Sequence, residues 1–379
     1  MVSVDNATFC PLPFAHVRIA AEGTYNICCR HSTPKQHAVN VNDQSLEQWK
    51  NSTYFQEVKN NFIQGKKHPG CENCWRIESL GQQSYRQMVS NDYKFFKIDT
   101  EFDKLVNVEI NLSNLCNLKC LMCNEKSSSA ILAENQKLGI NVHEQKDFAW
   151  TDLAYDHLQQ ILKEKPAMIS IVGGEPLYNK ELLNLLEKTN DDVLSNTVLS
   201  INTNATVWNH RWEQVIKKFK LVRFVFSLDA SQELYEYMRF PSSWDLVCDN
   251  IRQIHKMNNI KTYVNCVVQN LNINNLYDLI VWCRSENLDL LLTQLCQPSF
   301  LVLTNLPSNL KKQAMQHLDK CLSLHDLSDH VSNFLQSCQQ QLSQSLLNDF
   351  DQELWTTCRD YLQTRDQLRT NSHKKFLEY

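Results

Sequence analysis

The chain has 379 residues, enough for one large domain with one or two smaller ones, and a formal net charge of −4 at pH 7. This balance lacks the concentrated basic surface of nucleic-acid-binding proteins, so we expect no nucleic-acid partner. No stretch approaches the roughly 18 apolar residues of a membrane span and no secretory signal is visible, which predicts a soluble, cytoplasmic protein without a membrane partner.

The first hundred residues contain two paired-cysteine regions joined by a helical stretch over residues 46–62. In a chain without an export signal, 15 cysteines favour metal binding or catalysis over disulfides. Eight of them lie in the first third of the chain: Cys10, Cys28, Cys29, Cys71, Cys74, Cys116, Cys120 and Cys123.

The middle of the chain alternates strand-like and helical segments, which predicts a parallel sheet. Apolar residues alternate over 106–112, and the short apolar run 168–172 ends at Gly173. Further strand-like runs cover residues 198–202, 222–228, 262–268 and 288–292, separated by helical stretches such as 275–285. Six strands fit an open barrel of six β/α units and are too few for a closed eight-stranded barrel.

After about residue 305 the pattern becomes helical, with an amphipathic stripe over residues 331–362. Cys338 and Cys358 fall in this stripe, and we expect both to be small core residues. The same packing role is expected for the single cysteines among apolar neighbours: Cys248, Cys266, Cys283, Cys296 and Cys321. The fold class is therefore α/β: an amino-terminal domain (1–100), a partial (β/α)6 barrel (101–304) and a helical carboxyl-terminal extension (305–379).

Cys116-x3-Cys120-x2-Cys123 directly follows the first of the six strands. An ordinary 4Fe–4S cluster takes four thiolate ligands. Three close cysteines with no fourth nearby would leave one iron free to bind a substrate or cofactor. The alternatives are a zinc site and buried thiols. Zinc sites usually combine a Cys-x2-Cys pair with a second Cys or His pair, and none follows within the usual reach.

Residues 111–124, NLSNLCNLKCLMCN, resemble the cluster-binding loop of the radical SAM superfamily. The resemblance implies that the open iron chelates the amino and carboxylate groups of S-adenosylmethionine (SAM). It also implies that electron transfer cleaves the sulfonium to a 5′-deoxyadenosyl radical. One departure is Met122, where the family often has an aromatic residue; a methionine can still pack against adenine.

Other elements within residues 102–295 are similar to motifs of the same family. Gly173-Gly174-Glu175-Pro176 resembles the GGEP element, which implies contact with the methionyl amino group. Thr203-Asn204 resembles the TN element near the ribose, while Ser227 and Arg239 resemble the pair that holds the SAM carboxylate. Taken one at a time, these residues would ordinarily be interpreted as a glycine turn, a helix cap and a solvated arginine. Their placement at the carboxyl ends of strands, where barrel active sites lie, favours the functional interpretation.

The amino-terminal cysteines resemble the twitch or SPASM modules of radical SAM enzymes, as in a subgroup where a twitch domain precedes the barrel. The resemblance implies one auxiliary 4Fe–4S cluster, held by Cys10, Cys28, Cys71 and Cys74. Cys29 points to the opposite face of an extended backbone and is expected to be a packed thiol or a lid. A structural zinc ribbon remains the alternative, because four thiolates would satisfy it equally.

The sequence therefore predicts a SAM-dependent radical enzyme that abstracts a hydrogen atom, with no catalytic acid or base assigned. The resemblance implies a peptide or protein side chain as substrate (crosslinking, dehydrogenation or epimerisation) and a flavodoxin- or ferredoxin-type reductant. One alternative is a dehydrogenase or epimerase of a sugar or another small molecule. Another is a non-catalytic iron–sulfur electron carrier, which would have no need of the GGEP element or of Ser227 and Arg239.

Overall fold

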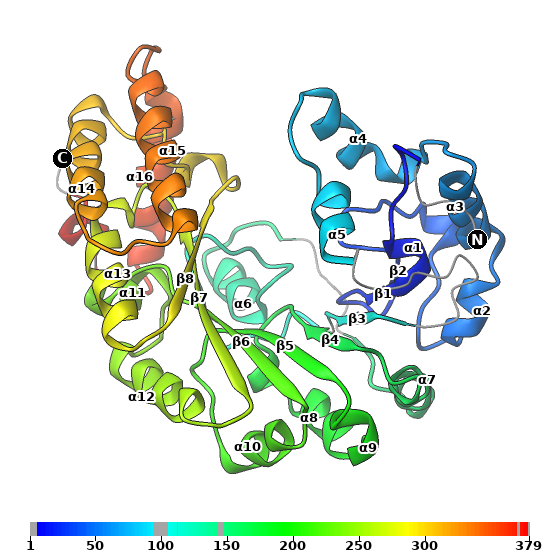
Figure 1. The fold of residues 1–379 in the computed structure, drawn as a ribbon. Coiled ribbons are helices and arrows are strands. Elements are labelled where there is room, and N and C mark those ends of the chain that lie inside the picture. Colours follow the sequence, from blue (N-terminus) through cyan, green and yellow to red (C-terminus); the bar gives the residue numbers. More distant parts are fainter. Residues whose placement is uncertain (1–5, 94–104, 112, 143–147, 370–371, 378–379) are drawn as a thin grey trace. The chain divides into compact units, whose positions relative to one another are not determined.

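The computed structural model describes residues 6–93, 105–111, 113–142, 148–369 and 372–377 (Figure 1). The chain divides into two compact units. The first unit comprises residues 1–114, 144–201 and 209–222, and the second unit comprises residues 115–143, 202–208 and 223–379. All 15 cysteines lie within the described residues, and none of them forms a disulfide. Within the described ranges, no helix combines the length and the apolar character that crossing a membrane requires.

The first unit contains a sheet with short helices around it. Its strands are β1 (His16–Ile19), β2 (Tyr25–Asn26), β3 (Asn107–Ile110), β4 (Met168–Ile171) and most of β5 (Val198–Thr203). Its helices are α1 (Leu12–Ala15), α2 (Leu46–Lys50), α3 (Thr53–Ile63), α4 (Glu72–Ser79), α5 (Tyr85–Tyr93), α7 (Asp152–Lys163), α8 (Lys180–Glu187), α9 (Asp191–Leu194) and α10 (His210–Lys217).

The strands of the first unit lie in the order β2-β1-β3-β4-β5, and only the β1–β2 pair is antiparallel. One row of partners across the parallel strands consists of Ile19, Ile110, Ile171 and Ile201. All four side chains are buried. Burying an isoleucine contributes about 1.5–3 kcal/mol, so this row helps to fix the register that places the strand ends.

The strands predicted over 106–112, 168–172 and 198–202 are confirmed as β3, β4 and β5. Strands β1 and β2 were not predicted, because β1 has four residues and two of them are polar. His16 is buried with Nδ1 2.8 Å from the Ile27 carbonyl oxygen, and Arg18 pairs with Glu109 on β3. The stretch 46–62 is two helices, since the Ser52 hydroxyl caps α3 by accepting from the Phe55 amide.

The second unit contains the remaining strands and the longer helices. Strand β6 (Leu221–Ser227) begins in the first unit and ends in the second, which also contains β7 (Ile260–Val268) and β8 (Asp289–Gln294). The helices are α6 (Ser129–Lys137), α11 (Gln232–Met238), α12 (Trp244–His255), α13 (Leu276–Ser285), α14 (Ser308–Leu322), α15 (Asp329–Ser345) and α16 (Gln352–Asp366).

Strands β7 and β8 are parallel, with Cys266 opposite Leu292. The strands predicted over 222–228, 262–268 and 288–292 and the helix over 275–285 are confirmed. Helix α14 packs against α13 and α15, and Figure 1 shows α14 and α15 side by side. The predicted stripe is divided between α15 and α16, and six of the predicted core cysteines are buried: Cys248, Cys266, Cys283, Cys321, Cys338 and Cys358.

The prediction that Cys296 is a core residue is wrong, because its side chain is exposed. It follows the end of β8, where the chain has left the sheet, and its apolar neighbour Leu295 is the buried residue. The domain boundaries stay a prediction. The boundary at residues 100–101 lies outside the described residues.

Candidate functional site

The loop that carries Cys116, Cys120 and Cys123 belongs to the second unit and is held by backbone hydrogen bonds. The Lys119 amide donates to the Phe240 carbonyl (2.7 Å), and the Leu121 amide donates to the Met238 carbonyl at the end of α11 (2.9 Å). Burial raises the pKa of the Cys123 thiol to about 12 and also raises that of Cys120. The two backbone hydrogen bonds to Phe240 and Met238 thus hold the loop without involving a thiol.

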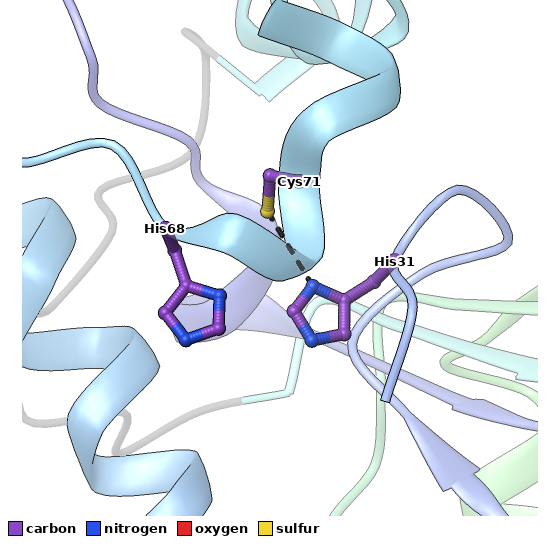
Figure 2. Close-up of side chains that lie close together, drawn as sticks. All are labelled: His31, His68 and Cys71. Carbon is purple, nitrogen blue, oxygen red and sulfur yellow. Dashed lines mark hydrogen bonds between the residues drawn. The ribbon is translucent and has the colours of Figure 1, made fainter. Parts of the chain in front are cut away.

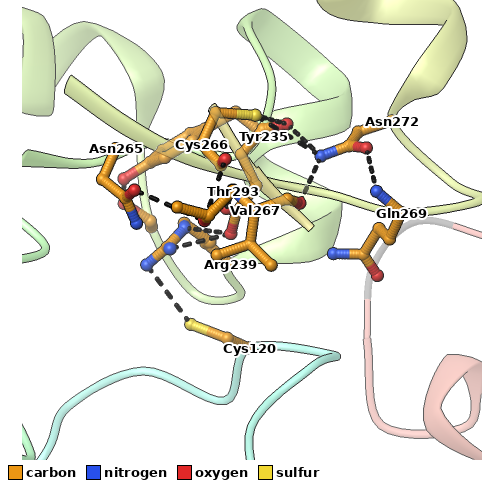
Figure 3. A network of polar contacts seen from close by, with 11 residues as sticks. Cys120, Tyr235, Arg239, Asn265, Cys266, Val267, Gln269, Asn272 and Thr293 are labelled. Carbon is orange, nitrogen blue, oxygen red and sulfur yellow. Dashed lines mark hydrogen bonds and ion pairs between the residues drawn. The ribbon is translucent and has the colours of Figure 1, made fainter. Parts of the chain in front are cut away.

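Arg239 forms a buried ion pair with Asp229. Figure 3 shows the Arg239 guanidinium directed at Cys120 of this loop. Its Nε and Nη2 donate to Asp229 Oδ2 at 2.8 and 2.7 Å, and its Nη1 lies 3.8 Å from Cys120 Sγ. Asp229 Oδ1 accepts from the Val267 amide at 2.9 Å, and the Asn272 amide group donates to the Asp229 carbonyl at 2.7 Å. The ordinary interpretation of Arg239 as a solvated surface residue is therefore wrong.

Asn204 also contacts the cysteine loop. It follows the last residue of β5, and its Nδ2 donates to Asn117 Oδ1 at 3.1 Å, while Asn117 Nδ2 donates to Thr206 Oγ1 at 2.8 Å. The sequence analysis missed Asn117, although its position directly after Cys116 was the available signal. Ser227 is half-buried as the last residue of β6. The second unit thus brings Asn204 and Arg239 to the loop that carries the three cysteines.

The Gly173–Pro176 element lies in the first unit, where β4 ends. Gly173 and Gly174 have φ values of +89° and +52°, a conformation that favours glycine. A Cβ atom at Gly173 would lie 1.6 Å from Asn111 Oδ1, so this position admits no side chain. Glu175 is 1% exposed, and its Oε1 accepts from the Leu177 amide at 3.0 Å. One carboxylate oxygen therefore caps the following turn.

Four amino-terminal cysteines line one cavity of the first unit: Cys10, Cys28, Cys71 and Cys74. Cys10 precedes α1, Cys28 follows β2, and the other two lie at the start of α4. Burial raises the pKa of Cys10 well above its ordinary value and raises those of Cys28 and Cys71 to about 12. Cys29 is exposed and does not line this cavity. This donor set fits a metal centre with four thiolate ligands.

The same cavity is lined by Arg86, a buried cation. Its Nε and Nη2 donate to the two Glu78 oxygens at 3.0 and 2.7 Å, and Nη1 donates to the Phe9 carbonyl at 2.7 Å. The guanidinium also lies 4.9 Å from the centre of the Trp75 ring. A fixed positive charge beside four cysteines favours their thiolate forms, which metal binding requires.

Two histidines that the sequence analysis missed lie beside Cys71 (Figure 2). His31 Nδ1 lies 3.4 Å from Cys71 Sγ, and His31 Nε2 lies 3.0 Å from the Tyr54 hydroxyl oxygen. His68 stacks on His31 with ring centres 5.6 Å apart. Burial lowers the pKa of His31 to about 4. The available signal was spacing: His31 lies three residues after Cys28, and His68 lies three before Cys71.

Comparison with known proteins finds similarity in the middle of the chain. Residues 110–283, from β3 to α13, match the family model described as the radical SAM superfamily. A probable GTP 3′,8-cyclase of Methanocaldococcus jannaschii is 25% identical over 182 residues, which are 47% of this chain and 55% of that protein. Molybdenum cofactor biosynthesis protein 1 of Dictyostelium discoideum is 22% identical over 209 residues, 54% of this chain and 31% of that protein.

Among solved structures, native anSMEcpe with bound AdoMet aligns with a TM-score of 0.42 and 18% identity, covering 57% of this chain and 58% of that one. The two curated relatives are matched over only part of their length: about half of the archaeal protein and less than a third of the Dictyostelium protein.

Proposed function

Residues 110–283 match the radical SAM family model, and we propose that the protein is an enzyme that binds a 4Fe–4S cluster and SAM. In the proposed reaction it abstracts a hydrogen atom from its substrate. The observation that carries the proposal is the loop in which Cys116, Cys120 and Cys123 are held by backbone contacts beside Arg239. When bound, such a cluster supplies the electron that cleaves SAM.

We assign proposed roles to the surrounding side chains. Asp229 uses one oxygen to hold two nitrogens of Arg239, which leaves Nη1 directed at the cysteine loop. In our proposal this guanidinium binds the SAM carboxylate, as a charge-assisted hydrogen bond favours. Ser227 would share this task. Asn204, which hydrogen-bonds to Asn117 of the cysteine loop, would position the ribose. The Gly173–Glu175 element would bind the methionyl ammonium, as its resemblance to the GGEP element implies.

The four-cysteine cavity of the first unit supports a second proposal, an auxiliary 4Fe–4S cluster on Cys10, Cys28, Cys71 and Cys74. Zinc would satisfy the same thiolates. The metal content of the chain with Cys116, Cys120 and Cys123 replaced by Ala, purified without oxygen, separates the two: iron and sulfide in equal amounts support the cluster, and zinc contradicts it.

A peptide or protein side chain is the proposed substrate, in line with the resemblance to twitch and SPASM enzymes, and a flavodoxin- or ferredoxin-type protein is the proposed reductant. A small molecule is the second candidate substrate. It is favoured by the named activity of the archaeal relative, a probable GTP cyclase that aligns with 47% of this chain. Turnover of peptides against nucleotides and sugars, followed by mass spectrometry, would distinguish these classes.

The central test is SAM cleavage. We expect the anaerobically reconstituted, reduced protein to convert SAM to 5′-deoxyadenosine and methionine, slowly when substrate is absent. Replacing Cys116, Cys120 and Cys123 together by Ala should abolish this product. Cys296→Ala is the matched control, because this thiol is exposed and outside the loop. Undiminished cleavage in the triple variant would show that these cysteines do not hold the SAM-binding cluster.

A further inference from the structure

The imidazole of His31 is held between two partners in the first unit. Its Nδ1 faces Cys71 Sγ at 3.4 Å (Figure 2). Its Nε2 faces the Tyr54 hydroxyl at 3.0 Å. The adjacent backbone is fixed as well, since the Ser32 amide donates to the Gly70 carbonyl at 2.9 Å. A Cβ atom at Gly70 would lie 2.5 Å from His31 Cε1, so the glycine leaves room for the ring.

His31, His68 and Cys71 could also be considered as three ligands of one metal ion, because their ligand atoms lie within 4.8 Å of one another. The contacts of His68 argue against this. Its Nδ1 accepts from the Gly70 amide at 3.0 Å, so in the neutral ring the proton is on Nε2, which lies 4.0 Å from Glu57 Oε1. A metal ion on His68 would displace one of these groups, and it would also compete with the cavity for Cys71.

The protonation pattern of His31 follows from the chemistry of Cys71. A neutral imidazole has one N–H group and one acceptor nitrogen. A thiolate that ligates metal has no proton to donate, so only a proton on Nδ1 makes the 3.4 Å contact favourable. Nε2 is then the acceptor, and the Tyr54 hydroxyl, which also lies 3.3 Å from the Ser32 carbonyl oxygen, can donate to it. The position of Tyr54 is compatible with this tautomer, and metal ligation by Cys71 selects it.

We propose that His31 donates a hydrogen bond from Nδ1 to the Cys71 thiolate and thereby raises the reduction potential of the auxiliary cluster. This inference rests on the auxiliary cluster proposed above. Reduction adds one electron, and with it negative charge, to a cluster and its ligand sulfurs. A hydrogen bond to a ligand sulfur stabilises that charge, and hydrogen bonds to the sulfurs are among the factors that set cluster potentials. His31 is therefore a positioning and tuning residue, held by Tyr54.

The test uses the full chain with Cys116, Cys120 and Cys123 replaced by Ala, so that only the auxiliary site can hold iron. His31→Phe keeps a planar ring and removes both nitrogens. The matched control is His68→Asn, because an Asn oxygen can still accept from the amide two residues later. Gly70→Ala is a second variant that displaces the imidazole without removing it, and it carries the test where His31→Phe does not fold.

Iron and sulfide are measured in each variant, followed by a dithionite titration monitored by electron paramagnetic resonance. We expect about four irons per chain in all of them. The midpoint potential should become more negative in His31→Phe and Gly70→Ala and stay unchanged in His68→Asn. Normal iron with an unchanged potential in His31→Phe would overturn the role of His31 alone. Absence of iron from the parent chain would overturn the auxiliary cluster and this inference together. Equal loss of a single bound metal ion in the two histidine variants would indicate the three-ligand metal site instead.

Discussion

Arg239 and Asp229 form a buried ion pair in which two guanidinium nitrogens donate to the same carboxylate oxygen, at 2.8 and 2.7 Å. Asp229 is fully buried and Arg239 is 8% exposed. Asp229 lies two residues after the end of β6, and Arg239 is the first residue after α11. The pair therefore joins a strand end to a helix end, and it directs the remaining nitrogen of Arg239 at Cys120.

Removal of the acid should destabilise the fold. In Asp229→Ala the buried guanidinium loses its counter-charge, and breaking a buried pair in this way costs about 3–5 kcal/mol. We expect the free energy of unfolding of the apo-protein, measured in urea, to fall by this amount. Glu213→Ala is the control: it removes an exposed pair with Lys217 and should change stability little. If Asp229→Ala and Glu213→Ala lost equal free energy of unfolding, burial of the Asp229–Arg239 pair would not explain its contribution to stability.

Arg239 should also contribute to SAM binding. Arg239→Ala removes a charge-assisted hydrogen bond, worth about 1.5–3 kcal/mol, so the Kd for SAM should rise roughly 10- to 150-fold. Equilibrium titration of the reconstituted proteins with SAM measures this change, and circular dichroism confirms that the variant is folded. Arg252→Ala, at an exposed pair with Glu286, serves as the control. An unchanged Kd in Arg239→Ala would leave this residue a purely structural partner of Asp229.

Gly173 should not tolerate alanine. A Cβ there would meet Asn111 Oδ1 at 1.6 Å, in addition to the strain of an alanine at φ +89°. Gly81→Ala isolates the strain, since Gly81 has φ +72° and no atom within 4 Å of an added Cβ. The control should lose about 1–2 kcal/mol of unfolding free energy. We expect Gly173→Ala to lose clearly more in the same urea titration; similar losses would show that Asn111 moves aside freely.

Acid should weaken the structure around the four-cysteine cavity through Glu78. Burial raises the pKa of this carboxyl, but hydrogen bonds from Arg86 and Ser84 outweigh it and hold the pKa below its usual range. A depressed folded-state pKa stabilises the protein above the unfolded-state value, and this stability is lost as the pH falls through the folded-state value. Between about pH 5 and 3, the apo-protein should therefore lose stability more steeply than Glu78→Gln.

Urea unfolding at a series of pH values measures this difference. Glu72→Gln removes an exposed carboxylate from the same helix and is the control. Parallel pH profiles for the native chain and Glu78→Gln would contradict the assigned linkage.

The features that could be predicted from sequence depend on local patterns. All six expected strands are present, because runs such as 168–172 are mostly apolar and are followed by a glycine. The burial of Cys338 and Cys358 could be predicted because the apolar stripe shows which face of a helix packs against the core. The radical SAM loop was recognisable since its three cysteines are close in sequence, and the family match covers that segment.

The missed features depend on contacts between distant residues. His31 meets Tyr54 and Cys71, which are 23 and 40 residues away, and no periodicity reports such a pairing. No role could be assigned to Asp229 from sequence, because its partner Arg239 is ten residues away and is placed by the end of α11. Cys296 was misassigned because apolar neighbours in sequence do not reveal where a strand stops.

The adjacent thiols Cys28 and Cys29 should behave differently towards metal. Cys28 lines the cavity with Cys10, Cys71 and Cys74, whereas Cys29 is exposed and outside it. Single Ser replacements, reconstituted without oxygen in the background that lacks Cys116, Cys120 and Cys123, test the difference by iron and sulfide content. We expect Cys28→Ser to lose about four irons per chain and Cys29→Ser to keep near-normal content. The reverse pattern would exchange the two roles, and zinc at the site in place of iron would support a structural ribbon with the same four thiolates.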